Sequence, residues 1–231
     1  YIGAVSVAGK SLKKTHEAIQ NAIADRFQRL NATITLSRLR TFPINVIGEV
    51  QFPGSYSVSG VEQVSELILK AGGLVDEPER RASMRNIQIL KFENGQWVNT
   101  GRRADLQLWN LTGREIYNPY LLDGEQIFVP VRRDSISISG AVRRPGSYEF
   151  APGDRISDLI TLGSDLRDRE PLPDAQLLRQ TPDGAWESIQ IDLVRVLQGD
   201  PSADLPLQAG DKLYVLGEER WVYVQGEVHF P

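Results

Sequence analysis

Several residue types that carry chemistry are scarce in this sequence. Cysteine is absent, which excludes disulfide bonds, thiolate nucleophiles and cysteine metal ligands. The only histidines are His16 and His229, which are too distant from one another to suggest a clustered metal site or a Ser-His-Asp set. No glycine-rich G-x-G-x-x-G run opens a helix, so a phosphate cradle is not indicated. We therefore expect no catalytic residue, no metal and no cofactor.

Long apolar runs and a strong charge imbalance are also missing. No apolar segment approaches the roughly 20 residues that a membrane-spanning helix requires. The formal net charge of −4 gives no reason to expect nucleic acid as a partner. With 41% hydrophobic and 24% charged residues in 231, the chain has an ordinary globular composition and is long enough for one or two cores. Any signal peptide or membrane anchor is expected to lie outside this sequence.

An internal repeat is the strongest feature that is present. The segment INVIGEVQFPGSY (44–56) aligns with ISISGAVRRPGSY (136–148) without a gap, and VYVQGEVHFP (222–231) begins a third copy. A further match lies downstream, where LLDGEQIFVP (121–130) resembles LQAGDKLYVL (207–216). A period of about 90 residues exceeds that of most solenoids and suits small tandem domains. The recurring motif positions are Gly48, Pro53, Gly54 and Tyr56; Gly140, Pro145, Gly146 and Tyr148; and Gly226 with Pro231.

The first half of a repeat predicts a hairpin followed by a helix. Alternating apolar residues predict a strand over 44–48, and Pro53-Gly54 predicts a tight turn with a positive φ at the glycine. A second strand follows over 55–58. Ser59 and Glu62 have capping-box spacing, so a helix is expected to begin there and to end at Gly72-Gly73. The second repeat predicts the same helix from Pro152, with Ser164-Asp165 in place of the two glycines.

The second half of a repeat predicts another hairpin, a short helix and a last strand. Asn94-Gly95 is a strong hairpin signal between 87–92 and Trp97, and Asp183-Gly184 plays the same part before Trp186. Short helices are expected over 105–110 and 192–198, and final strands over 126–129 and 212–216. This order predicts an α+β fold in which one helix packs across a mixed sheet, the β-grasp arrangement.

The first 41 residues have no repeated copy. The pattern predicts a strand over 1–7, a helix capped by Ser11, and a strand over 32–39. We therefore divide the chain into 1–41, a first β-grasp domain over 42–131, a second over 132–218, and the first strand of a truncated third over 219–231. This β-α-β piece is expected to be the end of a domain whose beginning is missing.

These residues resemble a known family. GEVQFPGSY, LILKAGGL and LLDGEQIFVP, with their second copies, resemble the soluble-ligand-binding β-grasp (SLBB) domain. The segment YIGAVSVAGKSLKKTHEAIQNAIADRF, with ATITLSRL after it, resembles the end of the polysaccharide-export domain. That order of domains is similar to the outer-membrane polysaccharide export family.

The resemblance implies a transport component and no enzymatic activity. By its family, the protein would be a periplasmic part of a conduit for capsular or exopolysaccharide at the outer membrane of a Gram-negative-type bacterium. The implied partners are the polysaccharide, further copies in a homo-oligomeric ring and an inner-membrane co-polymerase. The alternative is a soluble ligand- or glycan-binding β-grasp module without a conduit.

Three groups of side chains have two interpretations each. Arginine pairs in the middle of the chain are either solvated surface and interdomain ion pairs, or contacts to glycan and subunits, with Arg132, Arg133, Arg143 and Arg144 as the candidates. Trp97 and Trp186 either pack on their own sheets or stack on sugars. Asp154 and Asp158 favour a solvated helix face over an acid–base pair.

Overall fold

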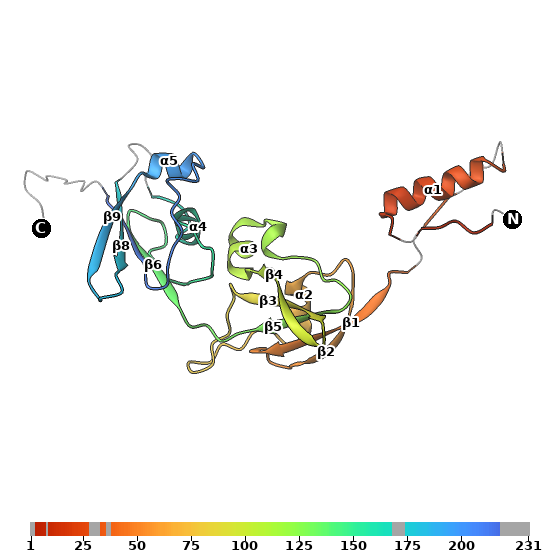
Figure 1. Cartoon of the computed structure of the whole chain (residues 1–231), viewed down its shortest axis with the longest axis horizontal. Coiled ribbons are helices and arrows are strands. Elements are labelled where there is room, and N and C mark those ends of the chain that lie inside the picture. The colour runs from red at the N-terminus through yellow and green to blue at the C-terminus, as the bar shows by residue number, and fades with distance from the viewer. Residues whose placement is uncertain (1–2, 8, 28–32, 36–37, 168–173, 218–231) are drawn as a thin grey trace, which may run out of the picture. The chain divides into compact units, whose positions relative to one another are not determined.

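The fold was analysed in a computed structural model of the chain, shown in Figure 1. The structure describes residues 3–7, 9–27, 33–35, 38–167 and 174–217. They fall into two compact units, residues 1–40 and residues 41–231. None of the helices among the described residues has the length and apolar character to cross a membrane.

The N-terminal unit is built on one helix, α1 (Leu12–Ala24). Its N-cap is Ser11, as predicted, whose hydroxyl accepts a hydrogen bond from the Lys14 backbone N–H at 3.4 Å. The expected flanking strands are wrong where they can be checked, because residues 3–7, 33–35 and 38–40 form no strand. A strand needs a partner for its backbone groups, and the described part of this unit provides none. The polysaccharide-export assignment of 1–41 stays a prediction.

The first repeat forms a five-stranded mixed sheet in the order β2-β1-β5-β3-β4. Only the neighbours β1 and β5 run parallel. The helix α2 covers one face of this sheet, since its apolar side chains share a core with the strands. The bounds are β1 (Thr41–Gly48), β2 (Gly54–Ser59), α2 (Val64–Lys70), β3 (Ile87–Glu93), β4 (Gln96–Ala104), α3 (Leu106–Thr112), η1 (Glu115–Tyr117) and β5 (Glu125–Val129).

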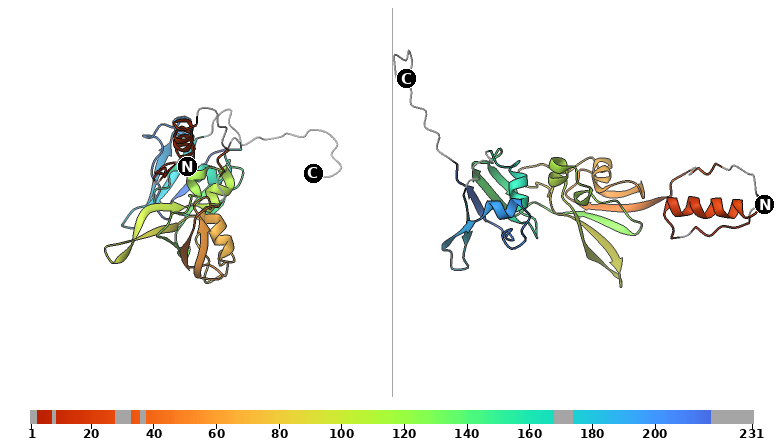
Figure 2. Two further views of the ribbon diagram at one scale, coloured as in Figure 1. Left: turned by 90° about the vertical axis from the view of Figure 1, so that its right-hand side faces the viewer. Right: turned by 90° about the horizontal axis from the view of Figure 1, so that it is seen from above.

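The second repeat has the same topology, with the strand order β7-β6-β10-β8-β9 and one parallel pair, β6 with β10. Its helix α4 packs on this sheet as α2 does on the first. Figure 2 shows the two hairpins β3–β4 and β8–β9 extending from their sheets. The bounds are β6 (Ser135–Gly140), β7 (Gly146–Glu149), α4 (Ile156–Leu162), β8 (Ala175–Gln180), β9 (Trp186–Ile191), α5 (Leu193–Leu197) and β10 (Lys212–Val215). The predicted α+β fold with tandem β-grasp-like domains is therefore confirmed.

The helices α2 and α4 begin later than expected. Gln63 and Arg155 are the N-cap residues, and the backbone N–H of each donates to the carboxylate of the acidic residue three positions on, Glu66 and Asp158 respectively. Ser59 instead ends β2, where its N–H donates to the Glu62 carboxylate at 2.9 Å. The capping-box spacing at Ser59 thus closes a turn before the helix rather than starting it.

The turn of the motif is also wider than predicted. Gly54 lies in β2 and has no positive φ, whereas Gly48 has a φ of +89°. The backbone N–H groups of Gln51 and Phe52 donate to carbonyls at the end of α2, those of Gly73 and Ala71. The chain leaves β1 at the glycine and touches the end of the helix before it returns as β2.

Candidate functional site at the junction of the two repeats

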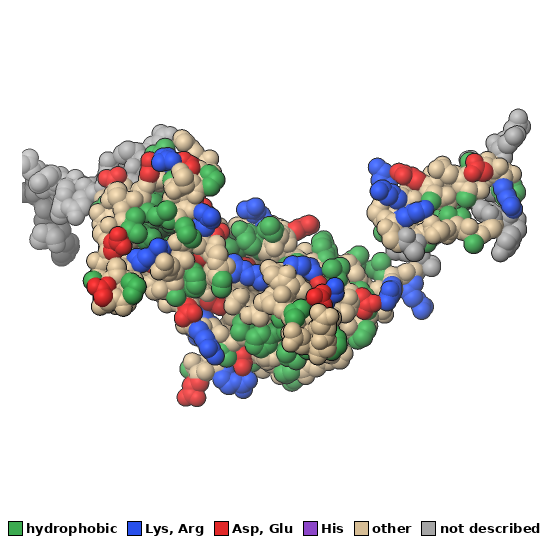
Figure 3. All heavy atoms as spheres, viewed as in Figure 1, with side chains coloured by type: hydrophobic (Ala, Val, Ile, Leu, Met, Phe, Trp, Pro, Cys, Tyr) green, Lys and Arg blue, Asp and Glu red, His purple; other side chains and the backbone are tan. Residues whose placement is uncertain are grey.

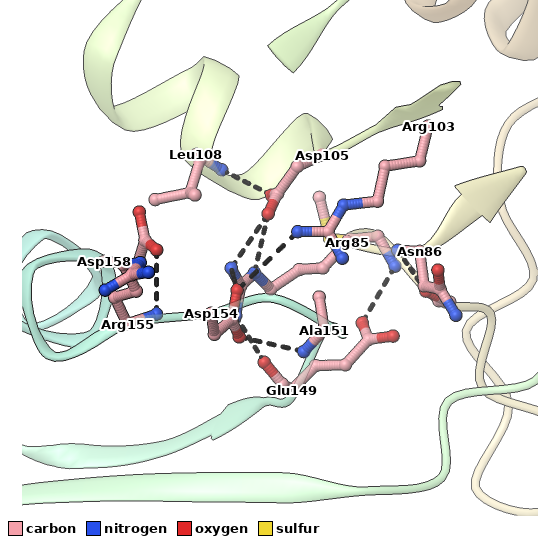
Figure 4. A network of polar contacts seen from close by, with 12 residues as sticks. Arg85, Asn86, Arg103, Asp105, Leu108, Glu149, Ala151, Asp154, Arg155 and Asp158 are labelled. Atoms are coloured by element: carbon pink, nitrogen blue, oxygen red, sulfur yellow. Dashed lines mark hydrogen bonds and ion pairs between the residues drawn. The ribbon is translucent and has the colours of Figure 1, made fainter. Parts of the chain in front are cut away.

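Arg85 joins the two repeats through a buried network (Figure 4). It lies just before β3 in the first repeat, and its side chain is 0% exposed. Its guanidinium donates to the two carboxylate oxygens of Asp154, in the second repeat, at 2.8 and 2.9 Å. It also donates to Asp105 at 2.9 Å and to the backbone carbonyl of Glu149 at 2.6 Å. Because both partners of the bidentate pair are buried while the repeats are packed together, each charge is compensated by the other and not by solvent.

Local bonds orient both carboxylates for this pair. Asp154 accepts from the Ala151 N–H at 2.8 Å, and Asp105 caps α3 by accepting from the Leu108 N–H at 2.8 Å. The first repeat has the same turn, in which Glu62 accepts from Ser59, but there the carboxylate pairs with Lys70 of its own repeat. The second repeat thus uses a shared turn motif to receive an arginine from its neighbour.

Apolar packing reinforces the polar network. Leu108 of α3 is buried in the core cluster of the second repeat, and Tyr117 packs against the same cluster. At the position corresponding to Leu108, after the N-cap of α5, the second repeat has Arg195, which pairs with Asp200. The second repeat therefore has no apolar side chain at the position from which Leu108 of the first repeat enters the neighbouring core.

Burial and neighbouring charges shift the pKa values of the ionisable groups at the junction. Burial acts to lower the pKa of Arg85, but the charges of Asp105 and Asp154 outweigh it and raise that pKa above its ordinary value. Burial raises the pKa of Glu149, whose carboxylate accepts from the Met84 N–H at 3.1 Å. Arg103 approaches Asp154 at 3.8 Å, and one of its terminal nitrogens is buried without a hydrogen-bond partner.

A cleft of about 340 Å³ opens beside this network. Its wall combines residues of the first repeat with Glu149 of the second and with Arg132 of the connection between them. Clefts at domain junctions are common ligand sites. Its lining residues are Leu74, Val75, Asp76, Arg81, Ala82, Met84, Gln107, Arg132 and Glu149.

The motif glycines and tyrosines hold the fold of each repeat. Gly48 and Gly140 both have a φ of +89°, and a Cβ at either position would overlap the backbone carbonyl of the adjacent strand, at Val129 or Val215. The hydroxyl of Tyr56 donates to the Phe52 carbonyl at 2.5 Å, and that of Tyr148 to the Arg144 carbonyl at 2.6 Å. Each carbonyl precedes the motif proline, Pro53 or Pro145. Gly226 and Pro231, like His229, lie outside the described residues.

The four arginines proposed as glycan or subunit contacts do not form one site. Arg132 and Arg133 lie in the connection between the sheets, where the N–H of Arg132 donates to the Arg81 carbonyl. Arg143 and Arg144 are exposed in the turn before β7, next to the end of α4. Their role as contacts stays a prediction.

Sequence reasoning missed the residues that matter most here. The expected solvated face at Asp154 is wrong, because that side chain is 0% exposed and neutralised by Arg85. Interdomain ion pairing was one interpretation of the arginines, but nothing separated Arg85 from its neighbours. Among the described residues, no group of three or more histidine, aspartate or glutamate side chains has the geometry to hold a metal.

A comparison with protein-family models agrees with this architecture. The SLBB domain model matches residues 43–95 and 135–202, which together make up more than half of the chain. The class defined by the fold is thus a tandem β-grasp-like protein. The chain belongs to the SLBB domain family.

Proposed function

We propose that this chain is the periplasmic part of a polysaccharide export protein and that it forms part of the wall of a conduit for capsular or exopolysaccharide. The single observation that carries the proposal is the buried Arg85–Asp154 pair between two SLBB repeats. A wall works by holding a fixed geometry, and this pair opposes rotation of one repeat against the other. The resemblance of residues 1–41 to the end of an export domain supports the same reading.

In this proposal the two repeats act as one rigid building block. Copies of the full-length protein assemble side by side into a homo-oligomeric ring, which encloses a hydrated path at the outer membrane. An inner-membrane co-polymerase delivers the polymer to the base of the ring. The exposed arginines Arg143 and Arg144 contact either a neighbouring subunit or an acidic polymer.

The second candidate is a glycan-binding module without a conduit. The observation that favours it is the cleft beside Arg85, where charged groups of both signs and apolar side chains line one space. Such a module would bind sugar as a monomer and would need no ring.

Electron microscopy of the full-length protein tests the proposal and separates the two candidates. Rings with a central opening support the conduit. Export of polysaccharide should then be lost in cells that carry only the Arg85→Ala protein and should persist with Arg80→Ala, which alters an exposed ion pair. Monomers in the microscope, together with unchanged export in cells that lack the protein, would overturn the conduit and leave the binding module.

A further inference from the structure

The outer face of each sheet, opposite the helix, carries the same diagonal row of side chains. In the first repeat the row is Phe128, Leu90 and Trp97 on the neighbouring strands β5, β3 and β4. Phe128 pairs with Gln88, two residues before Leu90, and Leu90 pairs with Asn99, two residues after Trp97. Positions two apart on a strand share a face, so these three side chains lie on one diagonal.

The second repeat has an equivalent row at the same register. Tyr214 pairs with Gln176, two residues before Leu178, and Leu178 pairs with Ser188, two residues after Trp186. The row Tyr214, Leu178 and Trp186 therefore repeats an aromatic residue, a leucine and a tryptophan on three neighbouring strands. We call these two rows the outer-face rows.

Both tryptophans are far more exposed than core residues. Trp97 is 43% exposed and contacts Phe92 edge-on, with ring centroids 5.4 Å apart, whereas Trp186 is 51% exposed and lies under the Lys212 ammonium group at 4.5 Å. Each ring therefore lies against its own sheet, as expected, but leaves about half of its surface to solvent. Figure 3 shows hydrophobic side chains interspersed with basic and acidic ones on one face of the molecule.

Among the described strands, the acidic side chain that shares a face with the rows is Glu149, which lies on the edge strand of the second sheet and is buried. On the described strands of the second sheet, the other polar side chains on the face of the row are serines, glutamines and Lys212. Around the first row they include Asn45, Gln88, Asn99 and Gln126. This is unusual in a chain of net charge −4 and favours a neutral or acidic ligand rich in hydroxyl groups.

We propose that the outer-face rows are binding surfaces for sugar rings of a polysaccharide. The apolar C–H face of a pyranose can stack on an exposed indole, while its hydroxyl groups exchange hydrogen bonds with the surrounding amides and serines. The rings of the polymer would contact the row, and Lys212 would favour carboxylated sugars on the second repeat. This inference rests on the proposed handling of polysaccharide and names the surface that contacts it.

A second copy of the chain is a poorer occupant. The three side chains of the second row offer roughly 300 Å² of apolar surface, and Ile47 and Phe92 add to the first row, but a stable protein interface buries about 800 Å² on each partner. A patch of this size is typical of a functional site on a monomer. Glu149 on the same face is buried and accepts a hydrogen bond from the Met84 N–H, so the described strands of an identical face offer Lys212 no exposed opposite charge.

Affinity electrophoresis through native gels tests the proposal. The probes are dextran, a neutral polymer, and hyaluronate, an acidic one, at increasing concentrations. The variants are Trp97→Thr, Trp186→Thr and their combination, since threonine preserves strand propensity. The matched control is Phe52→Ala, which removes an exposed aromatic ring that lies over Gly72 on the helix side. Circular dichroism verifies that each variant is folded.

We expect the double variant to bind about tenfold more weakly than the wild type, and each single variant about threefold more weakly. Phe52→Ala should bind like the wild type. Lys212→Gln, which installs the side chain found at Gln126 in the first repeat, should weaken binding to hyaluronate and leave binding to dextran unchanged. If the double variant does not fold, the two single variants decide.

Three results would overturn the inference. If the polymers retard the wild type and the tryptophan variants equally, the glycan binds at another surface, and the export proposal is unaffected. A wild type that neither polymer retards would remove the glycan surface, while rings and export remain an independent test of the conduit. Self-association of the wild type that the tryptophan variants abolish would assign the rows to a second copy.

Discussion

Arg85 and Asp154 lie 69 positions apart in the sequence, yet they form a bidentate ion pair in which both side chains are 0% exposed. The pair connects the first SLBB repeat to the second, and a second carboxylate, Asp105, shares the same guanidinium. Removal of the arginine leaves two carboxylates buried without their counter-charge. The stability of the whole two-repeat body should therefore depend on this one side chain.

Arg85→Met is expected to lower the free energy of unfolding by about 3–5 kcal/mol, because it strands two buried charges. Urea denaturation of the whole chain, followed by circular dichroism, measures the change. Arg80→Met is the control, since its pair with Glu49 is more than half exposed on the arginine side and should contribute only about 0–1 kcal/mol. Equal losses in the two variants would contradict a special role for the junction.

Asp154→Asn supplies the second arm of a double-mutant cycle with Arg85→Met. We expect the combined loss to be smaller than the sum of the single losses by about 1–3 kcal/mol, because the two residues share one interaction. Additive losses would show that the pair is not coupled and that the repeats are joined mainly by Leu108 and the apolar contacts around it.

The motif glycines make a prediction about backbone geometry. Gly48→Ala and Gly140→Ala should each destabilise the protein by more than about 3 kcal/mol, because the new Cβ overlaps a strand carbonyl in addition to the strained φ. Gly153→Ala is a close control, since Gly153 also has a φ of +89° but has open space around it. Gly153→Ala should lower the free energy of unfolding by only about 1–2 kcal/mol, which is the cost of the positive φ without an overlap. Thermal unfolding of the three variants compares them directly.

Ser164 occupies a left-handed conformation that a glycine occupies in the other repeat. Its φ is +57°, and its counterpart Gly72 has a φ of +82°. Ser164→Gly should raise the free energy of unfolding by about 0.5–1 kcal/mol, the relief of strain being partly offset by the entropy of the glycine in the unfolded chain.

Gly73 of the first repeat, at the position that corresponds to Asp165 in the second, has a φ of +92° with open space around it, and Gly73→Ala should lower the free energy of unfolding by about 1 kcal/mol. Melting temperatures of both variants against the wild type test the pair. A destabilising Ser164→Gly would mean that the serine side chain contributes more than its backbone strain costs.

Glu149 gives the junction a defined pH dependence. Burial raises its pKa above the ordinary value of 4.5, although Ser83, Met84, Arg132 and Arg85 all favour its charged form. A carboxyl group whose pKa is higher in the folded state binds its proton more tightly there. Its contribution to stability is present below the unfolded pKa and is lost as the pH rises through the folded pKa.

Glu149→Gln should therefore remove part of this dependence. The wild type is expected to gain stability relative to the variant as the pH falls from 8 toward about 5. Urea unfolding at several pH values measures the difference, and the glutamine oxygen can still accept from the Met84 N–H. Parallel curves for the two proteins would contradict a raised pKa at Glu149.

Much of each repeat follows from the sequence because its signals are local. The hairpin at Asn94-Gly95 requires two adjacent residues with positive φ, 51° and 83° in the structure, and asparagine with glycine is the pair that adopts them most readily. Ser11 was predicted as a cap, and Asp105 and Asp192, predicted as the first residues of short helices, are their caps; each bonds to a backbone group three residues away. Such contacts form within one stretch of chain, so the pattern alone predicts them.

The starts of helices and the turn of the motif were predicted less well. Ser59 and Glu62 have the spacing of a capping box and do bond to each other, but the helix begins only after Gln63. Gly54 follows a proline as in a tight turn, yet the positive φ falls on Gly48 because the chain must pass over the neighbouring strand. The start of α2 is bonded to Asn118 through Gln63 and Ser65, and Gly48 lies against Val129 of β5, so tertiary contacts outweigh the local preference in both places.

The sequence by itself determined the repeat, the order of strands and helices, and membership of the SLBB family. Only the tertiary structure decided which charges are buried and which aromatic rings are exposed. Asp154 reads as a surface residue because it lies in a polar stretch between Gly153 and Arg155, and the arginine that neutralises it, Arg85, arrives from the preceding repeat. Trp97 and Trp186 recur at matching positions, but exposure depends on which face of the sheet the helix covers. Burial and pairing across long separations are properties of the packed chain, and local pattern does not encode them.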